Sequence, residues 1–79
     1  MTVQLYVDFN ALQADGRLTT LLQFAVEAYQ VLPGAMLIVG DEEGNTAKAQ
    51  VLEVDSANGL VRLEVHGGTF TPAPLDRSA

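Results

Sequence analysis

The clearest alternation of apolar and polar positions lies between Leu32 and Val65, where three short apolar segments are separated by two polar turns. Pro33-Gly34 sets up a turn before the first segment, because proline fixes φ and glycine tolerates positive φ. The segments are shorter than ordinary helices, so the pattern predicts three consecutive strands. The strands expected here are Met36–Asp41, Ala47–Asp55 and Leu60–His66.

The second of these strands changes phase midway. Its first three apolar residues, Ala47, Ala49 and Val51, share one parity, whereas Leu52 and Val54 have the other. Because side chains alternate between the two faces of a strand, this change predicts a β-bulge or a sharp bend. The third strand is regular, and Asn58-Gly59 before it is a strong hairpin signal.

The N-terminal half predicts one strand clearly and a second less directly. Val3–Phe9 alternates apolar and polar residues, as in a half-buried strand. Leu18–Tyr29 carries apolar residues at helical spacing, but Thr19-Thr20 within it favours a strand, because β-branched residues suit a pleated surface. We expect a strand over Leu18–Leu22 followed by a short helical turn before Pro33, with a full helix over 18–30 as the alternative.

Five short strands, one of them bent, predict a mainly β protein with a small five-stranded SH3-like barrel, antiparallel throughout, and an OB-like barrel as the nearest competitor. The alternative is an α+β fold in which the 18–30 helix packs on a four-stranded antiparallel sheet. We expect one barrel domain over residues 1–70. The two glycines and two prolines after Val65 predict the end of the sheet, with Phe70 on the barrel rim and residues 71–79 as a disordered tail.

Composition narrows the possible functions. The 79 residues include no cysteine, which excludes disulfides and thiolate metal sites, and ten acids against four bases give a net charge of −6. An acidic surface repels phosphate, so sequence-independent nucleic-acid binding is disfavoured. With no long apolar run and no secretory signal pattern, we expect a cytoplasmic protein that does not enter a membrane.

Three groups of side chains deserve consideration as chemical sites. Asp41-Glu42-Glu43 is the densest acidic cluster, but it lacks the ligand spacing of a calcium loop and fits a solvated turn. Asp8, Asn10, Asp15 and Gly16 depart from that spacing too, and Asp8 or Asn10 is expected to hydrogen-bond the loop backbone instead. His66 is the only histidine and has no evident catalytic partner. We therefore expect no metal, no cofactor and no catalytic residue.

The remaining candidates suggest binding. Tyr6 falls on the polar face of the first strand, and tyrosines such as Tyr6 and Tyr29 are favoured at interfaces. Leu37 and Val39 lie in a continuous apolar strand that offers a patch if one face is uncovered. The leading hypothesis is a non-enzymatic protein-interaction module that uses Tyr6, Leu37 and Val39 to bind a protein partner or a second copy. A small-ligand or nucleic-acid-binding barrel is the alternative.

Several short motifs also carry a resemblance. They are VDFNA, a Gly-Arg-Leu-Thr-Thr-Leu-Leu stretch, LPGAMLIVGDEEG and AQVLEVD. The chain resembles a family of small uncharacterised proteins from high-GC Gram-positive bacteria with an Asp-x-Asn-Ala start, a Pro-Gly before an apolar strand and a Gly-Asp-Glu after it. The matching positions are Asp8, Asn10, Ala11, Pro33, Gly34, Gly40, Asp41 and Glu42. The resemblance implies a shared fold and assigns no activity.

Overall fold

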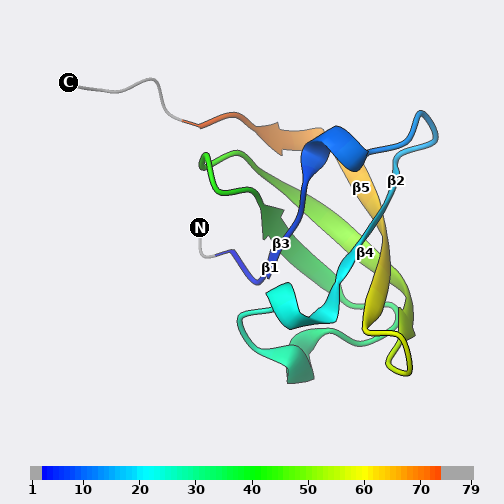
Figure 1. Ribbon diagram of the computed structural model, residues 1–79. Helices are drawn as coiled ribbons and strands as arrows, with labels where there is room; N and C mark the ends of the chain where they lie inside the picture. The colour runs from blue at the N-terminus through cyan, green and yellow to red at the C-terminus, as the bar shows by residue number, and fades with distance from the viewer. Residues whose placement is uncertain (1–2, 74–79) are drawn as a thin grey trace.

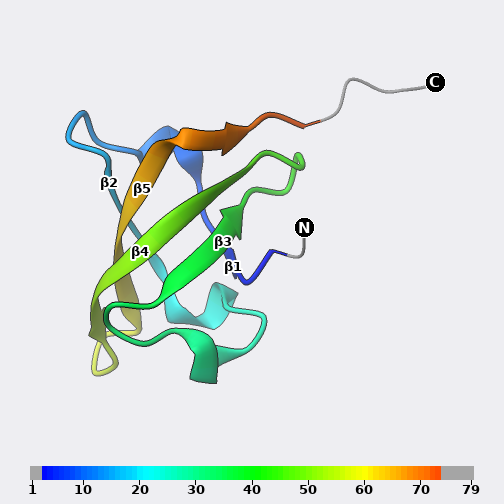
Figure 2. The same cartoon turned by 180° about the vertical axis from the view of Figure 1, so that it is seen from behind.

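The computed structural model describes residues 3–73, which form a single curled sheet of five strands that makes a half-barrel (Figures 1 and 2). In the sheet the strands follow the order β1-β3-β4-β5-β2. Their bounds are β1 Leu5–Tyr6, β2 Arg17–Leu21, β3 Met36–Gly40, β4 Thr46–Asp55 and β5 Leu60–Thr71. The predicted mainly β fold, consistent with a small SH3-like barrel, is confirmed.

The predicted meander is present as β3, β4 and β5, which pair antiparallel. The phase change in β4 is a register shift between Val51, which faces Leu63, and Glu53, which faces Arg62. Leu52 is the extra residue, and the shift brings Val54 back against the core. The predicted bulge is therefore confirmed, and it bends β4 so that the sheet curls.

The first strand differs from its prediction in two ways. Only Leu5 and Tyr6 of the expected Val3–Phe9 segment form a ladder, and they pair with β3 in the parallel direction, so the sheet is mixed and not antiparallel throughout. The alternation is nevertheless kept, since Leu5 and Val7 are buried and Tyr6 is exposed. A parallel neighbour became possible because the long connection from residue 7 to residue 35 carries the chain back to the same end of the sheet.

The opposite edge of the half-barrel and the segment that follows it are drawn toward β1 by hydrogen bonds. The Thr20 hydroxyl of β2 donates to the Tyr6 carbonyl at 3.0 Å. Leu5 forms an isolated antiparallel bridge with Ala25, and the Val26 amide donates to the Gln4 carbonyl at 3.0 Å. These bonds satisfy backbone groups that an open sheet edge would leave unpaired. β1 is thus fixed between β3 on one side and the segment that follows β2 on the other.

The contested segment forms a strand and then two short 3₁₀ turns. β2 is followed by η2 (Leu22–Phe24) and η3 (Ala28–Gln30), while η1 (Phe9–Ala11) lies between β1 and β2. The strand with a helical turn before Pro33 is confirmed, and the full helix of the α+β alternative is wrong. The spacing of apolar residues does not produce a helix, because Leu18 and Thr20 point inward from a strand paired with β5. Val26 and Tyr29, which would share the apolar face of that helix, are exposed.

The last strand is longer than predicted, because β5 continues past His66 to Thr71. The glycines at 67 and 68 fall within a second register shift, where the Lys48 amide donates to the Thr69 hydroxyl at 2.8 Å. A bulge accommodates them, and Pro72 comes only after the last paired residue. Phe70 packs edge-on against Phe9 of η1 with ring centroids 5.4 Å apart.

The segment predicted as a disordered tail lies mostly outside the described residues. Thr71 still belongs to β5, and the Ala73 amide donates to the Asn45 side chain at 2.7 Å. Residues 74–79 lie outside the part of the chain that the structure describes. Within residues 3–73, no helix is long and apolar enough to cross a membrane.

The core is a single cluster of aliphatic side chains on the inner face of the sheet. Its largest fully buried members are Leu5, Leu18, Val39, Val51, Val61 and Leu63. Leu37 and Val39 are 2% and 0% exposed, so the prediction that they form an interaction surface is wrong. Their strand is covered by the core on that face, whereas Met36, on the other face, is 49% exposed.

Candidate functional site

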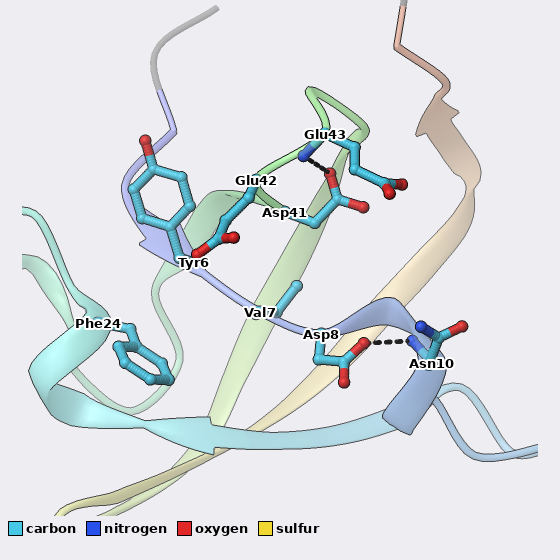
Figure 3. Close-up of a pocket in the computed structure, with 8 residues that line it drawn as sticks. All are labelled: Tyr6, Val7, Asp8, Asn10, Phe24, Asp41, Glu42 and Glu43. Atoms are coloured by element: carbon cyan, nitrogen blue, oxygen red, sulfur yellow. Dashed lines mark hydrogen bonds between the residues drawn. The ribbon is translucent and has the colours of Figure 1, made fainter.

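An open cleft of about 360 Å³ lies over β1, between the β3–β4 turn and η2 (Figure 3). We call it the acidic cleft. It is lined by Tyr6, Val7, Asp8, Asn10, Phe24, Asp41, Glu42 and Glu43. A neighbouring hollow shares Tyr6, Phe24, Asp41 and Glu42 and extends the cleft to Val3 and Gly44. The cleft is therefore an elongated groove and not a closed cavity.

Two aromatic side chains form one part of the cleft, as Figure 3 shows, and both are held by neighbouring elements. Tyr6 is 41% exposed because the alternation of β1 points it away from the core, and its carbonyl is fixed by Thr20. Phe24 is 44% exposed and ends η2, which is closed by a bond from the Ala25 amide to the Leu22 carbonyl. Exposed aromatic faces of this kind are frequent binding anchors.

The β3–β4 turn supplies the largest part of the negative charge, and Asp41 organises it. One carboxylate oxygen accepts the backbone amides of Glu43 and Asn45, each at 3.0 Å, and the other accepts the Asn45 side-chain amide at 2.8 Å. These bonds favour the charged form and, with the Asn45 side chain contributing most, hold the pKa of Asp41 below its ordinary value. Asp41 is thus a fixed negative charge at neutral pH.

Asp8 contributes a carboxylate from the opposite wall of the cleft. Its Oδ1 accepts the Asn10 backbone amide at 2.9 Å and caps η1, which confirms the predicted hydrogen bond to the loop backbone. Tyr6 in β1 and Asp8 two residues later both line the cleft. Among the hydrogen bonds of the described residues, none goes to the second carboxylate oxygen of Asp8.

Glu42 and Glu43 are exposed at the tip of the turn, and Figure 3 shows Glu42 between the aromatic rings and the other carboxylates. Among the described residues, no basic side chain lines the cleft. Arg17 and Arg62 are paired elsewhere, with Asp15 at 3.9 Å and with Glu53 at 3.1 Å. The cleft consequently concentrates negative charge beside two aromatic rings.

The structure separates the other predicted candidates from this site. Tyr29 is 72% exposed in η3 but does not line the cleft, and His66 lies on β5 opposite Lys48. Asp15 belongs to the turn before β2, where its side chain accepts the Arg17 backbone amide at 3.0 Å. Within residues 3–73, no group of three potential metal-ligating side chains is arranged to hold an ion.

Tyr6 was predicted from the sequence as a binding residue, whereas Phe24 and Asp8 were not predicted to line a cleft. For Asp8 a signal existed, because its parity matches that of Tyr6 on the first strand. Phe24 gave no such signal, since its position depends on the turn after β2 and on the Leu5–Ala25 bridge. Asp41-Glu42-Glu43 was recognised as an acidic turn, but its placement beside Tyr6 follows from the parallel pairing of β1 with β3.

No family model, no curated protein and no solved structure matches this chain. The resemblance to a family from high-GC Gram-positive bacteria and the cytoplasmic location therefore stay predictions. What can be stated of function rests on the geometry and charge of the chain itself.

Proposed function

We propose that this protein is a non-enzymatic protein-interaction module and that it binds its partner through the acidic cleft. The observation that carries the proposal is the exposure of Tyr6 and Phe24 within one elongated groove. A small domain gains little by leaving two aromatic rings in water, because their burial would otherwise add to a limited core. Aromatic anchors in a concave surface are typical of protein interfaces.

The chemistry of the cleft supports binding over catalysis. Its carboxylates belong to a turn and a cap, and His66 and the lining residues lie in different parts of the sheet. A general acid or base acts on a substrate beside a nucleophile or a second titrating group with a shifted pKa. Asp41 instead has a lowered pKa, which suits a permanent charge and not proton transfer.

The nucleic-acid alternative receives no support from the cleft, because phosphates are repelled by carboxylates and attracted by clustered bases. Of the three described bases, Arg17, Lys48 and Arg62, two are paired with an acid: Arg17 with Asp15 and Arg62 with Glu53. A protein partner meets no such penalty.

The proposal is tested by affinity capture from a lysate of the encoding organism, treated with nuclease. Three baits are compared: the wild type, a Tyr6→Ser/Phe24→Ser double variant and a Tyr29→Ser control. Tyr29 is a matched control because it is an exposed aromatic residue outside the cleft. We expect a protein that the wild type and the control recover in equal amount and that the double variant loses, with thermal unfolding showing all three folded. Recovery unchanged by the double variant would contradict the proposal.

A further inference from the structure

We infer that the acidic cleft receives an arginine side chain from a basic segment of the partner protein, an inference that rests on the proposed function and names the chemistry of its ligand. Three properties of the groove lead to a guanidinium group: its charge, its aromatic faces and its open, elongated shape.

The negative charge of the groove favours a cationic ligand. Asp8, Asp41, Glu42 and Glu43 line the groove, and within residues 3–73 no base lines it to offset them. Asp41 has its oxygens committed to the turn, but Glu42 and Glu43 form neither of the ion pairs found among the described residues. These two carboxylates are placed to accept donors from a ligand. The net charge of −6 adds a long-range attraction for a basic partner.

The aromatic rings select among cations. Tyr6, Phe24 and Glu42 line both hollows of the groove, so a group bound there meets this carboxylate and the aromatic rings. A guanidinium is planar, weakly hydrated and able to stack on an aromatic ring while donating to a carboxylate. An ammonium is a strongly hydrated point charge and gains less from the rings. The combination of rings and carboxylates therefore favours arginine over lysine.

The shape favours an extended segment over a free small cation. The groove continues past Tyr6 to Val3 and Gly44 and is open to solvent along its length. A metal ion needs convergent oxygen ligands, and the described residues hold no group of three arranged in that way. A peptide backbone with flanking side chains matches a long open groove, and its second basic residue would meet Asp8 or Glu43 at the far part of the cleft.

The inference is tested by titrating isotope-labelled protein with an acetylated peptide of alternating arginine and serine and following backbone amide shifts at low salt. The matched probes are the same peptide with lysine and with citrulline, the neutral isostere of arginine. We expect shifts confined to the cleft, around Tyr6, Phe24 and Glu42, and affinity in the order arginine, lysine, citrulline. The loss from arginine to citrulline should be about ten-fold or more, since two charge-assisted contacts are removed.

Two variants separate a specific site from general attraction. Glu42→Gln should weaken arginine-peptide binding about three-fold or more, whereas Glu27→Gln, which removes the same charge outside the cleft, should leave it nearly unchanged. Phe24→Leu keeps an apolar side chain but removes the ring, and it should weaken the arginine peptide more than the lysine peptide.

Three outcomes would overturn the inference. They are no cleft shifts with the arginine peptide, equal affinity for the arginine and citrulline peptides, and shifts spread over all acidic surfaces. Failure of the arginine inference can be told apart from failure of the proposed function, because lysate capture tests the proposed function independently. A partner whose recovery depends on Tyr6 and Phe24, together with a failed peptide titration, would remove the arginine assignment and keep the interaction module.

Discussion

At the scale of single residues, Asp41 combines structural and electrostatic roles. Its two carboxylate oxygens accept three hydrogen bonds from Glu43 and Asn45 and close the turn between β3 and β4. Asp55 has the same role in the next turn, accepting the Asn58 backbone and side-chain amides. The Asn58 side chain is the main reason that the pKa of Asp55 is also lowered. Both turns therefore depend on ionised aspartates.

Replacing Asp41 should reveal this dependence on pH. In Asp41→Asn an amide NH2 group replaces the carboxylate oxygen that accepts the Asn45 side-chain amide, so this hydrogen bond is lost. The change should lower the free energy of unfolding by about 1 kcal/mol at neutral pH. Because the folded pKa lies below the unfolded value of 3.8, the carboxylate stabilises the fold fully above that value and progressively less as pH falls through the folded pKa. Urea denaturation of wild type and variant should therefore show a difference of about 1 kcal/mol at neutral pH and a smaller one as the pH falls below 3.8. A constant difference would contradict this role.

At the scale of elements, the half-barrel depends on the contacts between β1, β2 and η2. β1 has only two ladder residues, so Thr20 and the Leu5–Ala25 bridge add to the contacts with β3 that hold it in place. The same contacts set the backbone from which Tyr6 and Phe24 enter the cleft. The position of Phe24 is thus fixed by the closure of the half-barrel, whereas Tyr6 already points outward through the alternation of β1.

Thr20→Val isolates this closure, since valine has nearly the same shape but no hydroxyl. Thr20 is only 8% exposed, and loss of its hydroxyl leaves the Tyr6 carbonyl without this hydrogen-bond donor. We therefore expect the free energy of unfolding to fall by about 1 kcal/mol or more. Thr19→Val is the control, because Thr19 is an exposed neighbour on the same strand. Equal stability of the two variants in urea denaturation would show that the hydroxyl bond has no part in closing the half-barrel.

At the scale of the whole molecule, stability and binding rely on the same small sheet. One aliphatic core on the inner face holds all five strands, and a domain of this size has only a few kcal/mol of net stability. Several large apolar side chains remain exposed, which leaves little reserve in the core. They include Tyr6, Phe24, Val26, Tyr29, Leu32 and Met36.

Truncations at adjacent positions of β3 should separate the two faces of the sheet. Leu37→Ala removes a side chain that is 2% exposed and should cost about 2–4 kcal/mol, enough to unfold much of the protein near 37 °C. Met36→Ala, one residue earlier and 49% exposed, should cost under about 1 kcal/mol. Thermal unfolding measures both. A mild effect at Leu37 would mean that this strand face is not packed in solution.

The local sequence determined the parts of the fold that depend on near neighbours. Alternation in β5, the phase change at Leu52 and the Asn58-Gly59 hairpin are properties of a few adjacent residues, and each appears as expected. Burial of one sheet face forces such patterns, so they can be recognised without knowing the rest of the chain.

Only the tertiary structure decided which segments meet across long stretches of sequence. The parallel pairing of β1 with β3 brings Tyr6 beside Asp41, and the turn after β2 brings Phe24 to the same groove. It also decided which face of β3 is covered, placing Leu37 and Val39 in the core, and carried β5 through its glycines by means of a bulge. Contacts of this kind depend on chain closure over many residues, for which local patterns carry no information. The fold was therefore largely predictable, whereas the cleft was not.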